Sequence, residues 1–255
     1  MLLTRELVRG SMPKASPRRP RFHAIAASMT KLEIKTTDGV CPAYLYRPKG
    51  PGPFPGAIVF MDGLGIRPAM LELGERLASH GYMVLLPDLF YRSGPYEPMD
   101  PHSVFSDPEK RKVLMEKYFA HATPENIMRD TPAFLDALAA QPDVKAGGFG
   151  VTGYCMGGFM ALTAAGTFPD RFVAAASYHG ARLATDLPNS PHLLAPKMKA
   201  KSASMSKNGC WKIAAGKKIA FFVWLHWAFT VCGVMPHSSR STVPPILSRF
   251  SRLSN

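Results

Sequence analysis

The chain has 255 residues, of which 46% are hydrophobic and 19% are charged, so it can bury the core of one sizeable α/β domain. Its net charge of +13 would suit a nucleic-acid binder, but the charge is concentrated at the two ends. Residues 1–28 carry +5 and residues 187–255 carry +10, whereas the segment between them carries −2. That central segment shows no basic face interleaved with aromatic residues, which argues against nucleic acid as a partner.

The cysteine pattern limits the chemistry of the chain. Neither C-x-x-C spacing nor the spacing of a zinc site occurs among its four cysteines: Cys41, Cys155, Cys210 and Cys232. We therefore expect no metal site. A reducing compartment is the default for such a pattern, which favours a cytoplasmic location.

The first 28 residues differ in composition from the central segment. They contain one acidic residue and five arginines, which resembles a transit peptide and would place the protein in an organelle. Proline at positions 13, 17 and 20 interrupts any amphipathic helix, which favours instead a start of translation at Met29. In either case 1–28 is an N-terminal extension, and we expect its deletion to leave folding unchanged.

Strand and helix patterns alternate from residue 31 onward. Apolar and charged residues alternate over 31–35, which predicts a half-buried strand, and 43–47 is its expected hairpin partner. The continuous apolar run 57–60 predicts a buried strand. This strand ends in MDGLG, residues 61–65, which we expect to be a flexible loop.

The next elements show the same alternation. A helix is predicted from Pro68 to about His80, and a buried strand over 83–86. Residues 91–106 are rich in proline and glycine and are expected to form a loop. A charged helix is predicted after Asp107, and another over 124–140.

The last predicted elements complete an α/β architecture. A strand over 149–152 leads through a tight turn into a helix that ends near Thr167, and 172–178 contains a further buried strand. The alternation implies a mostly parallel sheet with right-handed crossovers. Ligands bind at the carboxyl ends of such strands, where three loops are expected to meet: 62–65, 88–93 and 154–157.

The turn after residues 149–152 has the pattern of a nucleophile elbow. Residues 148–158 read GFGVTGYCMGG, which is G-x-S-x-G with Cys155 in the serine position. Gly153 and Gly157 supply the freedom from Cβ that the tight turn needs. The next helix begins behind Cys155 and stabilises a thiolate, and the Met156 N–H points where an oxyanion would form.

Two other interpretations of this stretch compete with the elbow. A lone cysteine in an apolar setting is usually a buried structural residue, but the Gly-x-Cys-x-Gly-Gly frame after a strand favours the nucleophile. Gly148, Gly150 and Gly153 also spell G-x-G-x-x-G, the fingerprint of dinucleotide binding. That fingerprint comes after its strand, whereas these glycines lie within the strand, so the elbow is the better interpretation.

Several segments together resemble the dienelactone hydrolase family of α/β-hydrolases over about residues 29–199. The segments that carry the resemblance are YLYRPKG, FMDGLG, ASHGYMVLLPDLFYR, TGYCMGGFMAL and SYHGARLATD. The resemblance implies an α/β-hydrolase fold. It also implies hydrolysis of small-molecule esters or lactones by a Cys-His-Asp triad, without a metal or an organic cofactor.

The resemblance also implies roles for individual residues. Cys155 would be the nucleophile, and the N–H groups of Met156 and Gly63 would form the oxyanion hole. Asp62 falls where the family often has a glutamate that pairs with the resting cysteine, and Arg92 where a family arginine binds a substrate carboxylate. Alternatively, Asp62 only forms a turn and Arg92 is a solvated loop residue.

Histidines and acids for the triad are harder to assign. His179 and His192 do not stand where the family has its catalytic histidine, and we interpret both as structural or supporting residues. The last acidic residue of the chain is Asp186, so the acid that the family places later has no counterpart. We therefore expect the C-terminal strands of the fold to be missing or replaced.

Residues 200–255 form a basic, atypical tail without strand–helix alternation. A frameshift or read-through in the coding sequence would explain such a tail. The rival explanation is the apolar run 219–234, which is short for a spanning helix and contains His226, but could attach the chain to a membrane.

Together these observations predict an ester or lactone hydrolase with a cysteine nucleophile. Because no triad acid or base is assigned, we expect this chain to turn over substrate poorly. The alternatives are a binding module that kept the pocket and lost the triad, and a hydrolase anchored to a membrane through its tail.

Overall fold

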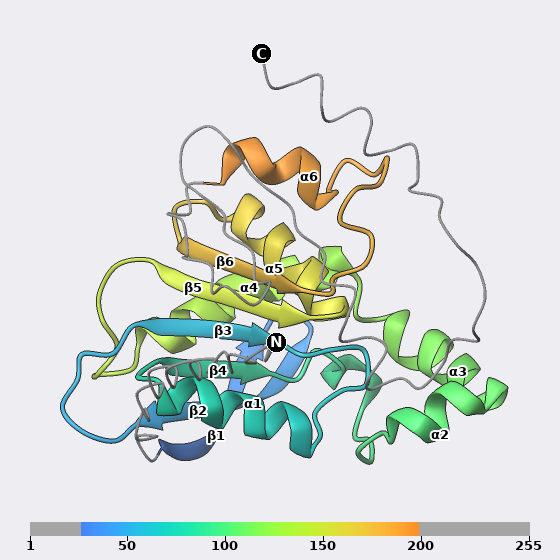
Figure 1. The fold of residues 1–255 in the computed structure, drawn as a ribbon, viewed down its shortest axis with the longest axis horizontal. Coiled ribbons are helices and arrows are strands. Elements are labelled where there is room, and N and C mark those ends of the chain that lie inside the picture. The colour runs from blue at the N-terminus through green and yellow to red at the C-terminus, as the bar shows by residue number, and fades with distance from the viewer. Residues whose placement is uncertain (1–26, 199–255) are drawn as a thin grey trace, which may run out of the picture.

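The computed structural model describes residues 27–198, which form a six-stranded sheet flanked by helices (Figure 1). The strand order is β1-β2-β4-β3-β5-β6. β1, β2 and β4 pair antiparallel, whereas β4, β3, β5 and β6 run parallel. The bounds of the strands are β1 Ala27–Thr36, β2 Gly39–Pro48, β3 Gly56–Phe60, β4 Met83–Pro87, β5 Phe149–Tyr154 and β6 Phe172–Tyr178.

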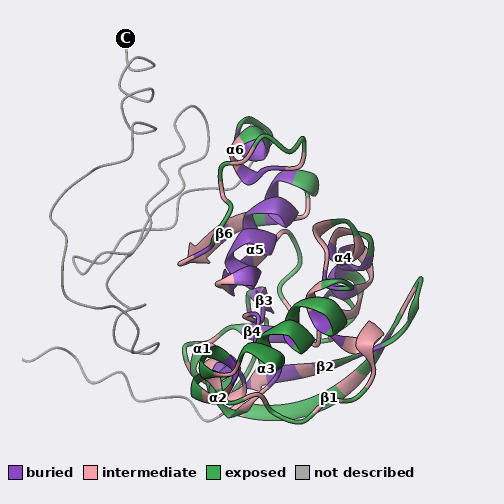
Figure 2. Ribbon diagram, turned by 90° about the vertical axis from the view of Figure 1, so that its right-hand side faces the viewer, coloured by how far each residue is buried: buried purple, intermediate pink, exposed green. Residues whose placement is uncertain are grey.

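Helices cover both faces of this sheet. Figure 2 shows α1 on one side of β3 and β4, and α4 on the other. α5 packs against α4 and α6, so these three helices share one layer. The bounds are α1 Pro68–Ser79, α2 Pro101–Ser106, α3 Pro108–Val113, α4 Pro124–Ala139, α5 Met156–Thr167 and α6 Pro191–Leu194, with a π-helical turn at Leu114–Phe119 and 3₁₀ turns at Tyr91–Ser93 and Ala195–Lys197.

The core explains why the apolar runs become strands. Every residue of β4 is buried, and the side chains of Ile58, Val59 and Phe60 in β3 have no exposed surface. These continuous apolar runs suit strands that helices cover on both faces. α5 is apolar all round, with Met156 to Gly166 buried without a break, as expected of a helix in the centre of a domain.

Most of the predicted elements are confirmed, with two corrections. The prediction of a loop over 91–106 is wrong, because this segment contains a 3₁₀ turn and α2. The signal for α2 is local: Asp100 accepts a hydrogen bond from the Ser103 N–H as the N-cap, and Pro101 occupies the first turn. β1 begins at Ala27, which pairs with Pro48, so residues 27 and 28 belong to the sheet and not to the extension.

The predictions for the two ends of the chain lie outside the described residues. These are the transit-like extension up to residue 26, the tail over 200–255 and the apolar run 219–234. Within residues 27–198, β6 is the last strand on its side of the sheet. In the same part of the chain, no helix has the length and apolarity to cross a bilayer.

Candidate active site

Cys155 lies in a sharp turn between β5 and α5, as the sequence predicts. Its backbone has φ 52° and ψ −114°, a left-handed conformation that is rare for a residue with a side chain. Its N–H donates to the Tyr178 carbonyl at 3.0 Å, and its carbonyl accepts from the N–H groups of Gly158 and Phe159. The turn therefore places the cysteine at the start of a buried helix, beside the end of β6.

The two elbow glycines are required by close approach of the backbone. A Cβ on Gly153 would overlap the backbone of Gly157, and a Cβ on Gly157 would overlap the carbonyl oxygens of Phe60 and Met61. Gly158 has a similar function, because its Cβ would lie 2.7 Å from Ser177 Oγ. The absence of side chains at these positions therefore lets the end of β3 and the start of α5 pack closely against the elbow.

The two predicted oxyanion donors lie just after neighbouring parallel strands, β5 and β3. Met156 is the first residue of α5, and Gly63 lies in the loop after β3, which pairs with β5 up to Phe60 and Gly153. A Cβ on Gly63 would lie 2.5 Å from the Phe119 ring, so an aromatic side chain from the π-helical turn contacts this loop. π-Helical turns occur frequently at functional sites.

Asp62 forms a turn and an ion pair in this loop. It accepts a hydrogen bond from the Leu64 N–H at 3.0 Å, and its two oxygens accept from Arg67 at 2.6 and 2.7 Å. Both side chains are largely buried, with 17% of Asp62 and 14% of Arg67 exposed. Asp62 thus forms a turn and also an ion pair, and its contact with the cysteine stays a prediction.

Arg92 is buried in an ionic cluster. Its Nε donates to Asp38 and its Nη2 to Asp130, each at 2.8 Å, and only 8% of its side chain is exposed. The alternative of a solvated loop residue is therefore wrong. Hydrogen bonds from Arg92 and then Arg129 hold the pKa of Asp38 below its usual value. Arg92 connects the β1–β2 turn to α4, and its role toward a substrate carboxylate stays a prediction.

Tyr96 links the loop after β3 to the loop after β4 through hydrogen bonds of its hydroxyl. The sequence patterns do not predict this link. The Tyr96 hydroxyl accepts from the Ile66 N–H at 2.8 Å and donates to Asp88 at 2.9 Å. Burial raises the pKa of Asp88, and hydrogen bonds from Phe90 and Tyr96 oppose that shift. Together with the contact of Gly157 and Met61, this confirms that the three predicted loops meet at one edge of the sheet.

His179 comes directly after β6 and lies beside the elbow. Its φ is 40°, and its ring lies 6.3 Å from the Tyr154 ring, which in turn stacks on Tyr178 at 4.8 Å. Burial lowers the pKa of His179 below 6.5, while the carboxylate of Asp62 acts in the opposite direction. His192, by contrast, lies in α6 and its Nδ1 pairs with Ser190 Oγ at 2.8 Å.

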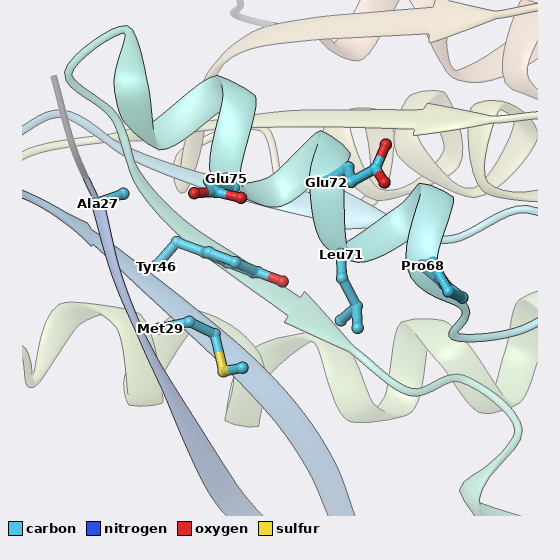
Figure 3. A pocket seen from close by; sticks show the side chains of 7 residues that line it. All are labelled: Ala27, Met29, Tyr46, Pro68, Leu71, Glu72 and Glu75. Atoms are coloured by element: carbon cyan, nitrogen blue, oxygen red, sulfur yellow. The ribbon is translucent and has the colours of Figure 1, made fainter. Parts of the chain in front are cut away.

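A hollow of about 330 Å³ lies elsewhere on the molecule, between α1 and the β1–β2 hairpin (Figure 3). None of its lining residues is a predicted site residue: Ala27, Met29, Tyr46, Pro68, Leu71, Glu72 and Glu75. Within residues 27–198, no group of three or more His, Cys, Asp or Glu side chains is placed to hold a metal ion.

The sheet order, the layers of helices and the elbow define an α/β-hydrolase fold. The sequence model of the dienelactone hydrolase family matches residues 41–203, which is more than half of the chain. The chain therefore belongs to the dienelactone hydrolase family.

Several known proteins show the same relationship. A carboxymethylenebutenolidase from a Pseudomonas species is 34% identical over 48% of this chain and 49% of its own length. The carboxymethylenebutenolidase of Pseudomonas putida is 27% identical over 66% of this chain and 67% of its own. A crystal structure of a Klebsiella pneumoniae protein assigned to the dienelactone hydrolases has a TM-score of 0.57 at 24% identity, covering 69% of this chain and 70% of that one.

The match to full-length relatives is incomplete. The chain spans 41% of the length of a relative from Methylorubrum extorquens and 65% of one from Salmonella typhi. The family and the fold therefore apply to the central domain of the chain.

Proposed function

We propose that this chain hydrolyses ester or lactone bonds of small molecules with Cys155 as the nucleophile. The observation that carries the proposal is the left-handed backbone of Cys155 at the junction of β5 and α5. Strained residues of this kind persist where the surrounding packing imposes them, and they cluster at active sites. The family membership of residues 41–203 supports the same reaction class.

The proposed reaction begins with the Cys155 thiolate. The thiolate attacks the carbonyl carbon of the substrate, and the charge that forms on the carbonyl oxygen is stabilised by the N–H groups of Met156 and Gly63. In related enzymes one such donor contributes about 3 kcal/mol to the transition state. The alcohol then leaves, a thioester remains on Cys155, and water hydrolyses it to the acid and the free thiol.

The position of Cys155 at the start of α5 favours the first half of this reaction. Helix α5 presents its N-terminal end directly behind Cys155, which stabilises negative charge on the sulfur. Hydrolysis of the thioester also needs a group that activates water. The proposal therefore predicts that acylation of Cys155 is faster than its deacylation. Because the nucleophile must stay a reduced thiol, we also propose that the chain acts in a reducing, cytoplasmic compartment.

The test is acetylation by p-nitrophenyl acetate. We expect a burst of about one equivalent of p-nitrophenol and a single acetyl group on the peptide that contains Cys155, detected by mass spectrometry. Cys155→Ala abolishes the burst, whereas Cys41→Ala retains it, because Cys41 has no exposed surface. A burst that survives in Cys155→Ala contradicts the proposal, and a folded chain that binds esters without any acetylation supports a binding module instead.

A further inference from the structure

We propose that the hollow between α1 and the β1–β2 hairpin binds a small organic cation, a primary ammonium group on an apolar stem. None of the residues proposed to act in hydrolysis lines this hollow, so the inference is independent of the proposed function. It depends on three properties of the lining, which are a buried hydroxyl without a partner, two unpaired carboxylates and an apolar wall.

Tyr46 contributes the buried hydroxyl. Only 3% of Tyr46 is exposed, and its hydroxyl has no hydrogen-bond partner within the described part of the chain. Buried polar groups without a partner are unfavourable and rare in native proteins. Figure 3 shows the hydroxyl directed toward the N-terminal half of α1, where Leu71 and Pro68 line the hollow. A ligand in the hollow would supply the missing hydrogen bond.

The ring of Tyr46 is held in a fixed position against α1. A Cβ on Gly74 would lie 2.5 Å from this ring, so the helix has a glycine where the ring approaches it. Glycine inside a helix is less favourable than alanine, and here the close approach requires it. Met29, the β1 partner of Tyr46, is 47% exposed, and its unbranched side chain can rotate aside to admit a ligand to the hydroxyl.

Two glutamates of α1 make the hollow negative. Glu72 and Glu75 both line it, and their spacing of three residues places them on one face of the helix. Neither carboxylate forms an ion pair within residues 27–198. Lys31, two positions beyond Met29 in β1, has its ammonium group 5.8 Å from the centre of the Tyr44 ring. The described lining therefore carries two negative charges and no positive one.

These acceptors match the donors of a primary ammonium group. Burial raises the pKa of Tyr46 to about 12, with further contributions from Tyr44 and Glu75. The phenol is thus neutral near pH 7, and its oxygen can accept a hydrogen bond. An ammonium group has three N–H donors and no acceptor, and the hollow offers it two carboxylates and the phenol oxygen.

The remaining lining selects for an apolar stem. Ala27, Met29, Pro68 and Leu71 present apolar surface beside the acceptors. A divalent metal ion needs oxygen ligands on all sides, which this surface does not supply, and two carboxylates repel an anion. The volume of about 330 Å³ lies at the small end of the range for ligand sites, which limits the occupant to a small molecule.

The first test is an NMR titration of the isotope-labelled full chain with hexylammonium chloride near pH 7, which follows the amide signals of Tyr46 and Gly74. Hexan-1-ol and hexanoate have the same stem and serve as controls for charge. We expect saturable shifts with hexylammonium, binding of the alcohol that is about tenfold weaker, and no binding of hexanoate. Equal affinity for the amine and the alcohol, or no saturable shift with the amine, would overturn the inference.

The second test separates ligand binding from a structural role of the lining. Because the Tyr46 hydroxyl has no partner in the free chain, Tyr46→Phe should weaken hexylammonium binding about fivefold without lowering the midpoint of urea unfolding. Glu75→Gln should weaken binding about tenfold. The controls Tyr82→Phe and Glu116→Gln change exposed residues outside the hollow and should keep the parent affinity. Parent affinity in both Tyr46→Phe and Glu75→Gln contradicts the inference.

The other possible occupant is the basic segment that precedes Ala27 in the chain. Its arginines would compete with the added amine if they bound in the hollow. Replacement of Arg18, Arg19 and Arg21 by glutamine in the full chain should therefore leave the affinity for hexylammonium unchanged. An affinity that rises about tenfold in this variant would show that the chain's own arginines occupy the hollow, which contradicts a small-molecule ligand.

Discussion

At the scale of single residues, the elbow and the ionic cluster of Arg92 are held together by contacts of very different range along the chain. The elbow depends on contacts within a few residues and on one neighbouring strand, so the spacing of Gly153, Cys155 and Gly157 is enough to identify it. The partners of Arg92 are Asp38 and Asp130, which lie 54 and 38 positions away in the chain. No local pattern reports such contacts, because only the completed fold brings them together.

A substitution at the elbow glycine Gly157 should be far more costly than one in β5, the strand before the elbow. In Gly157→Ala the new methyl group overlaps the carbonyl oxygens of Phe60 and Met61, and we expect a loss of about 3 kcal/mol or more. Gly150→Ala is the matched control, since its Cβ would make ordinary contact with Ala57 at 3.6 Å. Urea unfolding of both variants measures the difference, and equal stabilities would contradict the elbow geometry.

Removal of the Arg92 charge should destabilise the fold, because it leaves a buried carboxylate without its cationic partner. Asp130 is only 1% exposed, so Arg92→Met leaves it without its ionic partner and should cost about 3 kcal/mol. Arg171→Met is the control, because Arg171 pairs with Asp136 on the surface and its loss should cost less than about 1 kcal/mol. Thermal unfolding of both variants measures the two losses of stability, and similar losses would show that Arg92 does not stabilise Asp130 as a buried ion pair.

At the scale of elements, alternation of strands and helices is enough to predict β1 to β6, α1, α4 and α5. The helix α2 escapes prediction when proline and glycine are counted as loop formers over the whole stretch 91–106. Within that stretch, however, Asp100 is the N-cap of α2 and Pro101 lies in its first turn. The positions of these two residues indicate a helix, although the overall composition of residues 91–106 indicates a loop. The link from Tyr96 to the loops after β3 and β4 is again non-local.

The Tyr96 hydroxyl should stabilise this edge of the sheet. Tyr96→Phe removes the acceptor of the Ile66 N–H and a donor to Asp88, which we expect to cost about 1–3 kcal/mol. Tyr82→Phe serves as the control, since Tyr82 is 44% exposed and its replacement should change stability by less than about 0.5 kcal/mol. Chemical unfolding measures both, and a neutral Tyr96→Phe would mean that water replaces these bonds.

The start of β1 sets where the chain can be shortened. Removal of residues 1–26 leaves all ten residues of β1 paired with β2, so we expect the Tm to change by less than about 2 °C. Removal of residues 1–36 deletes the strand and should lower the Tm steeply or prevent folding. Scanning calorimetry of the two shortened chains tests this, and an equal loss in both would place folding determinants before Ala27.

At the scale of the whole molecule, the family and the fold of the central domain can be predicted from the sequence, while the state of the catalytic machinery cannot. Segments spread from β2 to the loop after β6 carry the resemblance, and the family match over 41–203 confirms it. A triad acid and base cannot be assigned, because the residues that carry them in the family come late in the chain. The pairing of β5 and β6 brings His179 near the elbow, a proximity that no local sequence pattern reports.

The stability of the domain should depend on pH partly through His179. Its pKa in the folded chain lies below the unfolded value of about 6.5, so the unfolded chain binds the proton more readily. The neutral ring carries no penalty above pH 6.5, and stability falls as the pH drops below that value. The Tm of His179→Asn, measured from pH 7.5 to 5.5, should therefore fall less steeply than that of the parent chain, and parallel curves would contradict the burial of the ring.

The most direct test of a nucleophilic elbow is the site selectivity of cysteine alkylation in the folded chain. Limited treatment with iodoacetamide at pH 7 and peptide mapping compare Cys155 with Cys41, the two cysteines of the described part. We predict early and nearly exclusive modification of Cys155, because it lies at the start of α5 while Cys41 is fully buried and burial raises the pKa of its thiol. Equal modification of Cys155 and Cys41 in a chain that unfolds cooperatively would contradict the claim that the elbow presents a reactive nucleophile.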